Sequence, residues 1–232
     1  DIGGESTRPN AAIVSTDEEL RRVVPVVQAI RQHFGDEIWL SVDTSNPQVM
    51  QAGVESGADI INDVRALRRD GAAQMAASLG VPVVLMHSRG EPDTMNELTV
   101  YTDVIREVID ELSHSIERAV SAGVAREQLV IDVGMGFAKT YEHHKVLMTQ
   151  LDTFIEEFDL PMLFGVSRKR FLGEILQRTG VDSLQNHQPH DRDVIGAGMS
   201  LLAVQQGASI VRVHDVAKSV QMLSMWQQIY GG

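Results

Sequence analysis

The stretch that decides the fold of this chain is Leu-Phe-Gly-Val-Ser-Arg-Lys-Arg-Phe-Leu, residues 163–172. An apolar run, residues 161–166, stops at Ser167, and the cations Arg168 and Lys169 follow where a helix is expected to begin. Such a junction brings together the free N–H groups of a helix N-terminus, a hydroxyl group and positive charge. It is therefore typical of a site for an anionic or electron-rich small molecule. The rest of the chain repeats this strand–loop–helix pattern.

Six apolar runs of this kind, and a stub at residues 1–2, alternate with helical patterns. The predicted strands are residues 38–42, 58–61, 81–86, 129–131, 161–166 and 209–213. The predicted helices are residues 16 to about 30, 46–57, 71–79, 102–122, 144–158, one beginning near residue 169, 192–206 and 216–230. Short, almost wholly apolar strands between helices are typical of a parallel sheet that helices cover.

This alternation predicts an α/β fold, a (β/α)8 TIM barrel. Closing the barrel needs one more strand and helix before residue 1, so we expect the given chain to lack the first βα unit and most of the second strand. An open doubly wound sheet is the alternative. It is disfavoured because no Gly-x-Gly-x-x-Gly turn follows a first strand.

Composition limits the classes of function that the chain can have. Its 232 residues carry a formal net charge of −12 and include no Cys, which excludes a disulfide framework and a thiolate metal site. No apolar run is long enough to span a bilayer, and no leading segment resembles a secretory signal. Lys and Arg do not cluster, so neither nucleic acid nor an anionic membrane is an expected partner. We expect a single cytoplasmic domain, residues 1–232.

Every predicted strand ends in a residue that carries charge or forms hydrogen bonds. These residues are Asp43, Asn62, His87, Asp132, Ser167 with Lys169, and Arg212 with His214. The carboxyl ends of the strands of a parallel barrel lie on one face, which is the face that carries function. Each residue alone is equally well explained as a turn former, a helix cap, a core histidine or an ion-pair partner. Six of them at one rim are harder to explain in that way.

The residue types at this rim suggest the ligand. Four polar side chains suit a flat heterocycle with an edge of N–H and carbonyl groups: Asp43, Asn62, Asp132 and Lys169. Met86 and Phe137 are expected along its faces. Two anion sites are predicted, one from Arg89, Arg212 and His214 and one from residues 167–170. Two anion sites beside a polar slot favour transfer between two substrates over hydrolysis.

Other catalytic patterns are missing from the sequence. There is no Ser-His-Asp order and no His-Glu-x-x-His zinc helix. We interpret His143 and His144 as solvated residues of a polar loop and the methionines as core residues.

Seven motifs occur here in the order and approximate spacing of one known family. They are Asp-Ile-Gly-Gly-Glu-Ser-Thr-Arg-Pro (1–9), Ser-Val-Asp-Thr (41–44), Ile-Asn-Asp (61–63), Leu-Met-His (85–87), Gly-x-Gly-Phe-x-Lys (134–139), Gly-Val-Ser-Arg-Lys (165–169) and Arg-Val-His-Asp (212–215). Over its whole length the chain resembles the dihydropteroate synthases. Members of that family join 6-hydroxymethyl-7,8-dihydropterin diphosphate to p-aminobenzoate in folate biosynthesis and release pyrophosphate. Sulfonamides compete for the p-aminobenzoate site.

The resemblance implies a role for each matching residue. The implied pterin-binding residues are Asp43, Asn62, Met86, Asp132, Phe137, Lys169 and Arg212, and the implied diphosphate-binding residues are Arg212 and His214. The implied p-aminobenzoate-binding residues are Thr7, Arg8, Pro9, Phe137, Lys169 and Arg170. The implied catalytic residues are Asp43, Asp132, Lys169, Arg212 and His214. Mg2+ is the implied cofactor, with its main protein ligand expected in the absent first loop and none within the given chain, and a homodimer is the implied assembly.

Three departures from the family pattern affect these expectations. The first βα loop, which closes over the reaction, has no counterpart in the given chain, so a protein that began at residue 1 is expected to bind pterin but not to turn over. Val133 stands where the family usually has Pro, which loosens the backbone beside Asp132. Arg170 stands where many members have Ser, and an Arg still suits a carboxylate.

Two other functions compete with this one. A methyltetrahydrofolate methyltransferase would keep the pterin-binding acids but has little use for Ser-Thr-Arg-Pro or a diphosphate site. A non-catalytic pterin-binding module is the other alternative. Pyrophosphate release from the two substrates distinguishes a synthase from both.

Overall fold

The structure, a computed structural model, describes residues 1–7, 11–91, 94–180 and 188–231. These residues form seven parallel strands. The strands are β1 (Ile2–Gly3), β2 (Ser41–Asp43), β3 (Ile60–Asp63), β4 (Val83–Met86), β5 (Leu129–Asp132), β6 (Leu163–Phe164) and β7 (Ile210–Val211). Strands β1 to β5 form one sheet in chain order, and β6 pairs with β7. A parallel bridge between Ile131 and Met162 connects the two sheets.

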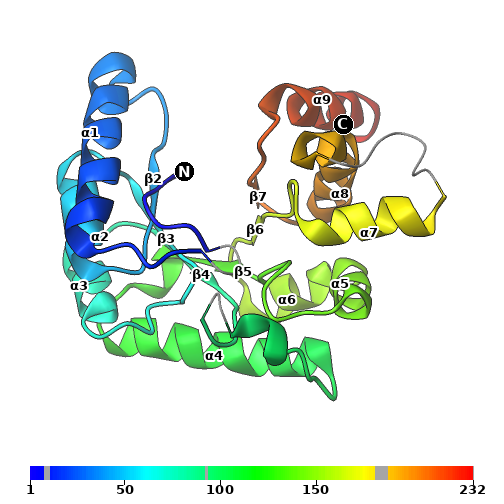
Figure 1. The fold of residues 1–232 in the computed structure, drawn as a ribbon, viewed down its shortest axis with the longest axis horizontal. Helices are drawn as coiled ribbons and strands as arrows, with labels where there is room; N and C mark the ends of the chain where they lie inside the picture. Colours follow the sequence, from blue (N-terminus) through cyan, green and yellow to red (C-terminus); the bar gives the residue numbers. More distant parts are fainter. Residues whose placement is uncertain (8–10, 92–93, 181–187, 232) are drawn as a thin grey trace.

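Helices surround the strands (Figure 1). They are α1 (Thr16–Phe34), α2 (Pro47–Glu55), α3 (Ala72–Leu79), α4 (Val104–Ser121), α5 (Tyr141–Met148), α6 (Leu151–Phe158), α7 (Arg170–Arg178), α8 (Asp193–Gln205) and α9 (Val216–Tyr230). Parallel strands in sequence order inside a layer of helices are the architecture of a TIM barrel. The predicted fold class is confirmed, and the described residues supply seven of the eight strands of such a barrel.

No ladder joins β7 to β1 in the part of the chain described here. A side-chain contact connects these two strands instead, because Nε of Arg212, just after β7, lies 2.5 Å from Oδ2 of Asp1. The contact pairs opposite charges on the residue before β1 and the residue after β7.

The alternation of side chains along the strands divides the apolar residues into two clusters. Ile60, Val84, Val130 and Leu163 pack on one another as a small separate cluster, which we assign to the interior of the barrel. Residues one position along from these, such as Ile61, Leu85 and Ile131, belong to the large cluster that packs against the helices. Neighbouring side chains of a strand point to opposite faces, which explains the division.

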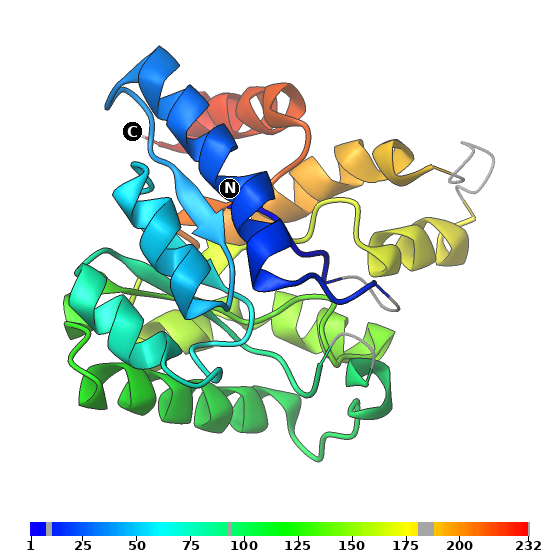
Figure 2. The same ribbon diagram turned by 60° about the vertical axis from the view of Figure 1, so that its left-hand side comes forward.

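The helices lie outside the strands (Figure 2), and most of their buried apolar residues belong to the large cluster that includes Ile61, Leu85 and Ile131. Helix α4 begins where the side chain of Asp103 accepts the backbone N–H groups of Ile105 and Arg106, both at 3.1 Å. It buries Val108 and Leu112 at helical spacing, as its sequence pattern predicts. Across the described residues, no helix has both the length and the apolar composition needed to cross a bilayer.

One predicted helix is wrong. Residues 144–158 form two helices rather than one, because α5 ends at Met148 and α6 begins at Leu151. The interpretation of His144 as a solvated residue is also wrong. It lies on the buried face of α5, where its ring stacks on Phe171 at 4.4 Å and its Nε2 accepts the backbone N–H of Gly136. Its neighbour His143 is only partly buried, and its Nδ1 accepts the backbone N–H of Thr140 at the start of the helix.

Candidate active site

Some of the residues predicted at the strand ends form one layer inside the barrel. Asn62, Met86 and Asp132 each follow a residue of the interior apolar cluster by two positions and so point inward. Asp43 pairs with Asn62 in the register of β2 and β3. We call Asp43, Asn62, Met86, Asp132 and Arg212 the rim layer.

Asp1 holds the rim layer together, and the sequence analysis missed it. Its Oδ2 accepts hydrogen bonds from Nδ2 of Asn62 at 3.2 Å and Nε of Arg212 at 2.5 Å, and its Oδ1 accepts the hydroxyl of Ser41 at 2.7 Å. The alternation of side chains along the strand could have indicated its position. Asp1 precedes Gly3 by two positions and so shares its face, and Gly3 pairs with Asp43 across the ladder.

Asp43 faces the same cation. Its Oδ2 lies 3.6 Å from Nη2 of Arg212, and its side chain is 19% exposed. Burial raises the pKa of Asp43 to about 6, against the opposing effect of Arg212. The carboxyl group therefore changes charge close to neutral pH.

Asp132 of the rim layer interacts electrostatically with Lys169, which lies at the start of α7. Asp132 is buried, and its Oδ1 accepts the backbone N–H of Gly134 at 2.7 Å. Burial raises the pKa of Asp132, although Lys169 opposes the shift, and burial lowers the pKa of Lys169 to about 8. The ammonium of Lys169 donates to the carbonyl of Met135 and lies 4.6 Å from the ring centroid of Phe137. These groups act on one another electrostatically and on Arg212, so they share one site.

A buried lysine shapes the loop that follows β5. The Nζ of Lys139 lies 2.8 Å from Nδ1 of His87 and donates to the carbonyls of Gly134 at 3.2 Å and Phe137 at 3.1 Å. The other ring nitrogen of His87 lies 3.0 Å from Glu111 of α4. Burial lowers the pKa of Lys139 to about 7 and that of His87 to about 3, so His87 is neutral. His87 is thus a core histidine with both nitrogens bonded, and Lys139 holds the loop that carries Phe137.

Gly134 is required where this loop meets the end of β4. Its φ is +68°, and a Cβ there would lie 1.8 Å from the carbonyl oxygen of His87. Any side chain would push the loop off the strand, and with it Phe137 and the backbone N–H that Asp132 accepts.

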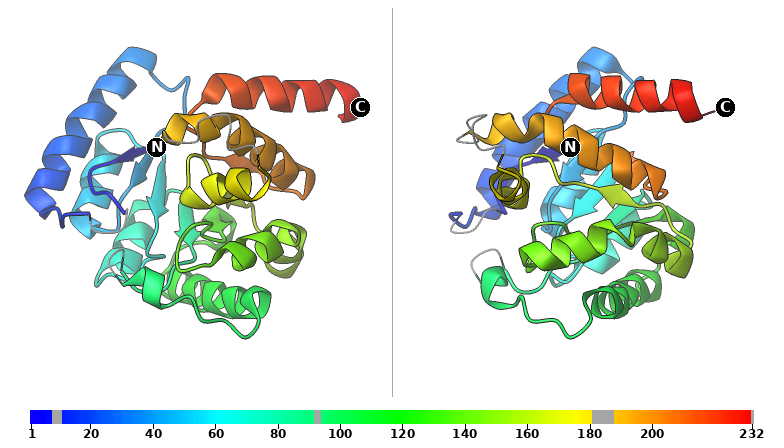
Figure 3. Two further views of the ribbon diagram at one scale, coloured as in Figure 1. Left: turned by 45° about the vertical axis from the view of Figure 1, so that its right-hand side comes forward. Right: turned by 90° about the vertical axis from the view of Figure 1, so that its right-hand side faces the viewer.

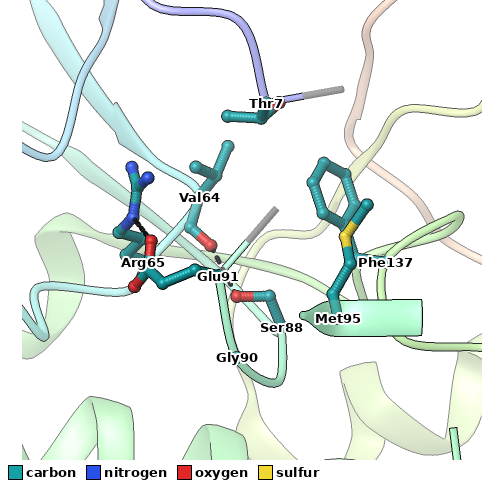
Figure 4. Close-up of a pocket in the computed structure, with 8 residues that line it drawn as sticks. All are labelled: Thr7, Val64, Arg65, Ser88, Gly90, Glu91, Met95 and Phe137. Atoms are coloured by element: carbon teal, nitrogen blue, oxygen red, sulfur yellow. Dashed lines mark hydrogen bonds and ion pairs between the residues drawn. The ribbon is translucent and has the colours of Figure 1, made fainter. Parts of the chain in front are cut away.

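A small pocket lies beside the rim, between the loops that follow β1, β3, β4 and β5 (Figure 4). It is lined by Thr7, Val64, Arg65, Ser88, Gly90, Glu91, Met95 and Phe137. Thr7 and Phe137, two residues assigned to p-aminobenzoate by the resemblance, share this pocket. Arg8 and Pro9 lie outside the described residues.

Other predicted residues lie apart from the rim layer. The side chain of Arg170 is 90% exposed and its Nε lies 3.6 Å from Glu174, so it does not line the pocket. The prediction of Arg89 in an anion site is wrong, because its guanidinium is bonded to Glu107 and Glu111 of α4.

In the second predicted anion site, residues 167–170, two side chains are already bonded to other residues of the chain. Arg168 makes a bidentate pair with Asp193 at 2.8 and 2.9 Å. The hydroxyl of Ser167 accepts the backbone N–H of His214 at 3.1 Å and lies 3.0 Å from its Nδ1, which places His214 beside the start of α7. Lys169 of this segment contacts the loop that follows β5, through the carbonyl of Met135.

The chain is similar to known proteins over most of its length. Residues 1–214 match the family model described as pterin binding enzyme. The chain is 45% identical over 223 residues to the dihydropteroate synthase of Escherichia coli K12, covering 96% of this chain and 75% of that protein. The chain belongs to the dihydropteroate synthases.

Solved structures of dihydropteroate synthases share the fold. That of the Yersinia pestis enzyme with a sulfonamide drug superposes with a TM-score of 0.91 at 41% identity, covering 99% of this chain and 79% of that one. The Xanthomonas albilineans enzyme in complex with 7,8-dihydropteroate gives a TM-score of 0.84 at 40% identity, covering 94% of this chain and 76% of that one. Both the sequence identity and the superposition therefore support the assignment of a TIM barrel to this chain.

Replacing Gly134 with Ala is predicted to disrupt the site of this dihydropteroate synthase. The overlap with the carbonyl of His87 and the positive φ together are expected to lower the free energy of unfolding by at least about 3 kcal/mol. Gly80→Ala is the matched control, because φ there is +66° and no heavy atom lies within 4 Å of the added Cβ, so about 1–2 kcal/mol is expected. Urea unfolding measures both. Equal losses in the two variants would contradict the role given to the close approach.

The raised pKa of Asp43 predicts how stability depends on pH. Between its unfolded value of 3.8 and its folded value of about 6, the folded state binds more protons, so the contribution of Asp43 to stability falls as pH rises through this window. Asp43→Asn removes this loss. Relative to the wild type, the variant is expected to gain about 1–2 kcal/mol of unfolding free energy between pH 4 and pH 7.5, after allowance for partial exposure. Urea unfolding at both pH values tests it, and a pH-independent difference between the two proteins contradicts it.

Proposed function

We propose that the rim layer of this chain binds 6-hydroxymethyl-7,8-dihydropterin diphosphate and that the pocket beside it receives p-aminobenzoate, so that the chain, together with a first βα loop, forms 7,8-dihydropteroate and releases pyrophosphate. One observation carries the proposal: charged side chains from four different strand ends, Asp43, Asp132, Lys169 and Arg212, lie close enough that the two cations oppose the raised pKa values of the two acids, with Asp43 3.6 Å from Arg212. The product carried by the Xanthomonas albilineans relative, 7,8-dihydropteroate, is consistent with it.

The chemistry of the rim suits a pterin ring. Carboxylate and amide groups of Asp132 and Asn62 complement the donor and acceptor edge of a pterin, and Lys169 supplies a cation and donor. Met86 and Phe137 supply apolar surface for the flat faces of the ring. Because Asp132 and Asn62 are almost fully buried, the rim discriminates against ligands that leave their hydrogen bonds unmade.

The reaction needs charge stabilisation more than a strong base. The C–O bond to the diphosphate breaks with its electron pair on the leaving oxygen, and positive charge develops on the pterin methylene carbon. The amine nitrogen of p-aminobenzoate forms the new C–N bond and then loses a proton. Asp43 and Asp132 stabilise the developing positive charge, and Arg212 and His214 stabilise the leaving diphosphate. An aromatic amine is unprotonated at neutral pH, so the pocket chiefly positions it.

Mg2+ remains part of the proposal because of the resemblance. The described residues contain no group of three or more His, Asp or Glu side chains arranged to hold a metal ion. Mg2+ characteristically binds substrate phosphates with few protein ligands, and it would supply further charge neutralisation at the diphosphate.

The remaining expectations are a single cytoplasmic domain and a homodimer. One apolar cluster extends from Val23 to Ala208, which supports a single domain. Helix α9 packs beside α8 at the edge of the molecule (Figure 3) and buries only Ser219 among its described residues. Val216 and Val220, one turn apart on the same side of α9, are 62% and 53% exposed, and exposed apolar residues of this kind suit contact with a second copy.

The activity is tested by mixing both substrates with a protein in which the first βα unit precedes residue 1, and measuring pyrophosphate. Release that requires p-aminobenzoate is expected. A methyltetrahydrofolate methyltransferase or a non-catalytic pterin-binding module would release none, and that result would contradict the proposal.

Asp132→Ala is predicted to weaken pterin binding by about 1–3 kcal/mol, which corresponds to about 5- to 150-fold in Kd, because donors on the buried pterin lose their acceptor. Asp110→Ala, on the exposed face of α4, is the control and is expected to leave the Kd unchanged. Calorimetric titration with the pterin measures both. An Asp132→Ala variant that binds pterin as tightly as the wild type contradicts the assignment of the rim.

Val220→Glu is predicted to convert a dimer to a monomer without loss of fold, since the side chain is half exposed in the single chain. Light scattering after size-exclusion chromatography measures the mass, and urea unfolding controls for stability. Wild-type protein that is monomeric, or a variant that remains dimeric, excludes α9 as the contact.

A further inference from the structure

Arg65 occupies an unusual position at the end of β3. The preceding carboxylate, Asp63, is fully buried, and its two oxygens accept the backbone N–H groups of Arg65 and Leu67, each at 2.8 Å. Ala66 and Leu67 adopt φ values of +49° and +58°. This tight turn leaves the side chain of Arg65 only 8% exposed.

The guanidinium of Arg65 connects three loops. Its Nε donates to Oε2 of Glu91 at 2.7 Å, in the loop after β4, as the dashed line of Figure 4 marks. Its Nη1 donates to Oε2 of Glu5 at 3.1 Å, in the loop after β1, and to the hydroxyl of Ser45, after β2, at 3.2 Å. A planar guanidinium fixes such partners more strictly than an ammonium can.

Glu5 lies two residues before Thr7, and Thr7 faces Phe137 in the pocket beside the rim (Figure 4). Two residues of chain span at most about 7 Å, so fixing the side chain of Glu5 restricts where Thr7 can lie. Glu91 lines the same pocket directly. Arg65 therefore holds two walls of the pocket without belonging to the rim layer.

Charge gives a second reason for this arrangement. Glu5 lies 3.1 Å from Arg65 and 3.6 Å from Arg69, and its side chain is 13% exposed. With these cations in place, the two carboxylates beside the pocket are balanced. Without Arg65, Glu5 and Glu91 would repel an anion that enters the pocket.

We propose that Arg65 is a positioning residue for the second substrate: by holding Glu5 and Glu91, it sets the wall formed by Thr7 opposite Phe137 and keeps the pocket open to the carboxylate p-aminobenzoate. The inference rests on the proposed function. A purely structural ion pair would affect both substrates alike, whereas this role affects p-aminobenzoate alone.

The test measures binding rather than turnover, so that loss of catalysis does not hide the effect. Calorimetry gives the Kd of 6-hydroxymethylpterin in the presence of pyrophosphate, and then the Kd of p-aminobenzoate with both present. For Arg65→Gln, the Kd of p-aminobenzoate is expected to rise about tenfold while that of the pterin changes less than twofold. Arg65→Lys keeps the charge but loses the planar guanidinium, so its Kd for p-aminobenzoate is expected to lie between those of the wild type and Arg65→Gln.

Arg31→Gln is the matched control. Arg31 is also mostly buried and tied to a carboxylate, Asp59 at 2.5 Å, and to the carbonyl of Gly57, but these lie before β3, at the opposite end of the strand. The control is expected to lose stability with both Kd values unchanged. Equal weakening of both ligands by Arg65→Gln, unchanged p-aminobenzoate binding, or the same selective loss in Arg31→Gln overturns the inference. A wild type that includes the first βα unit and binds both ligands but releases no pyrophosphate overturns the proposed function alone.

Discussion

The two-residue alternation of side chains along parallel strands is the constraint on which this structure depends. Ile60, Val84 and Val130 face the barrel interior and pack together. The residues two positions later on the same strands must face the same interior, so Asn62, Met86 and Asp132 are carried into one layer above them. A site assembled from distant segments therefore needs no special device beyond the register of the sheet.

Keeping so many ionisable groups inside the barrel has a cost, which their pKa values reveal. Burial raises the pKa of Asp43 to about 6 and lowers that of Lys169 to about 8, so both lie closer to neutral pH than in water. Arg212 and Lys169 partly compensate the acids they face. A ligand with complementary charge and hydrogen bonds would complete this compensation, so buried charged groups of this kind favour ligand binding.

The sequence predicted the parts of the site that follow from local pattern. Strand ends at Asp43, Asn62 and Asp132 were recognisable because each closes a short apolar run, and they lie together in the structure. Lys139 was not recognised as buried for two reasons. Its partner His87 lies far away in sequence, and the close approach of Gly134 to the carbonyl of His87 depends on the backbone conformation of the loop.

Arg89 shows the opposite error. Its position after a strand suggested a ligand site, but Glu107 and Glu111 take up its guanidinium. The signal was present, since two acids four residues apart on a predicted helix form one negative stripe that needs a cation. Asp1 was missed because a two-residue strand gives too short a pattern to read alternation without its partner strand.

A crystal structure of this protein soaked with the pterin diphosphate and p-aminobenzoate tests the central claim most directly. The account predicts that the pterin ring lies inside the barrel against Asn62 and Asp132, with p-aminobenzoate between Thr7 and Phe137. Ligand density at the amino-terminal end of the strands, or between the helices, would contradict it.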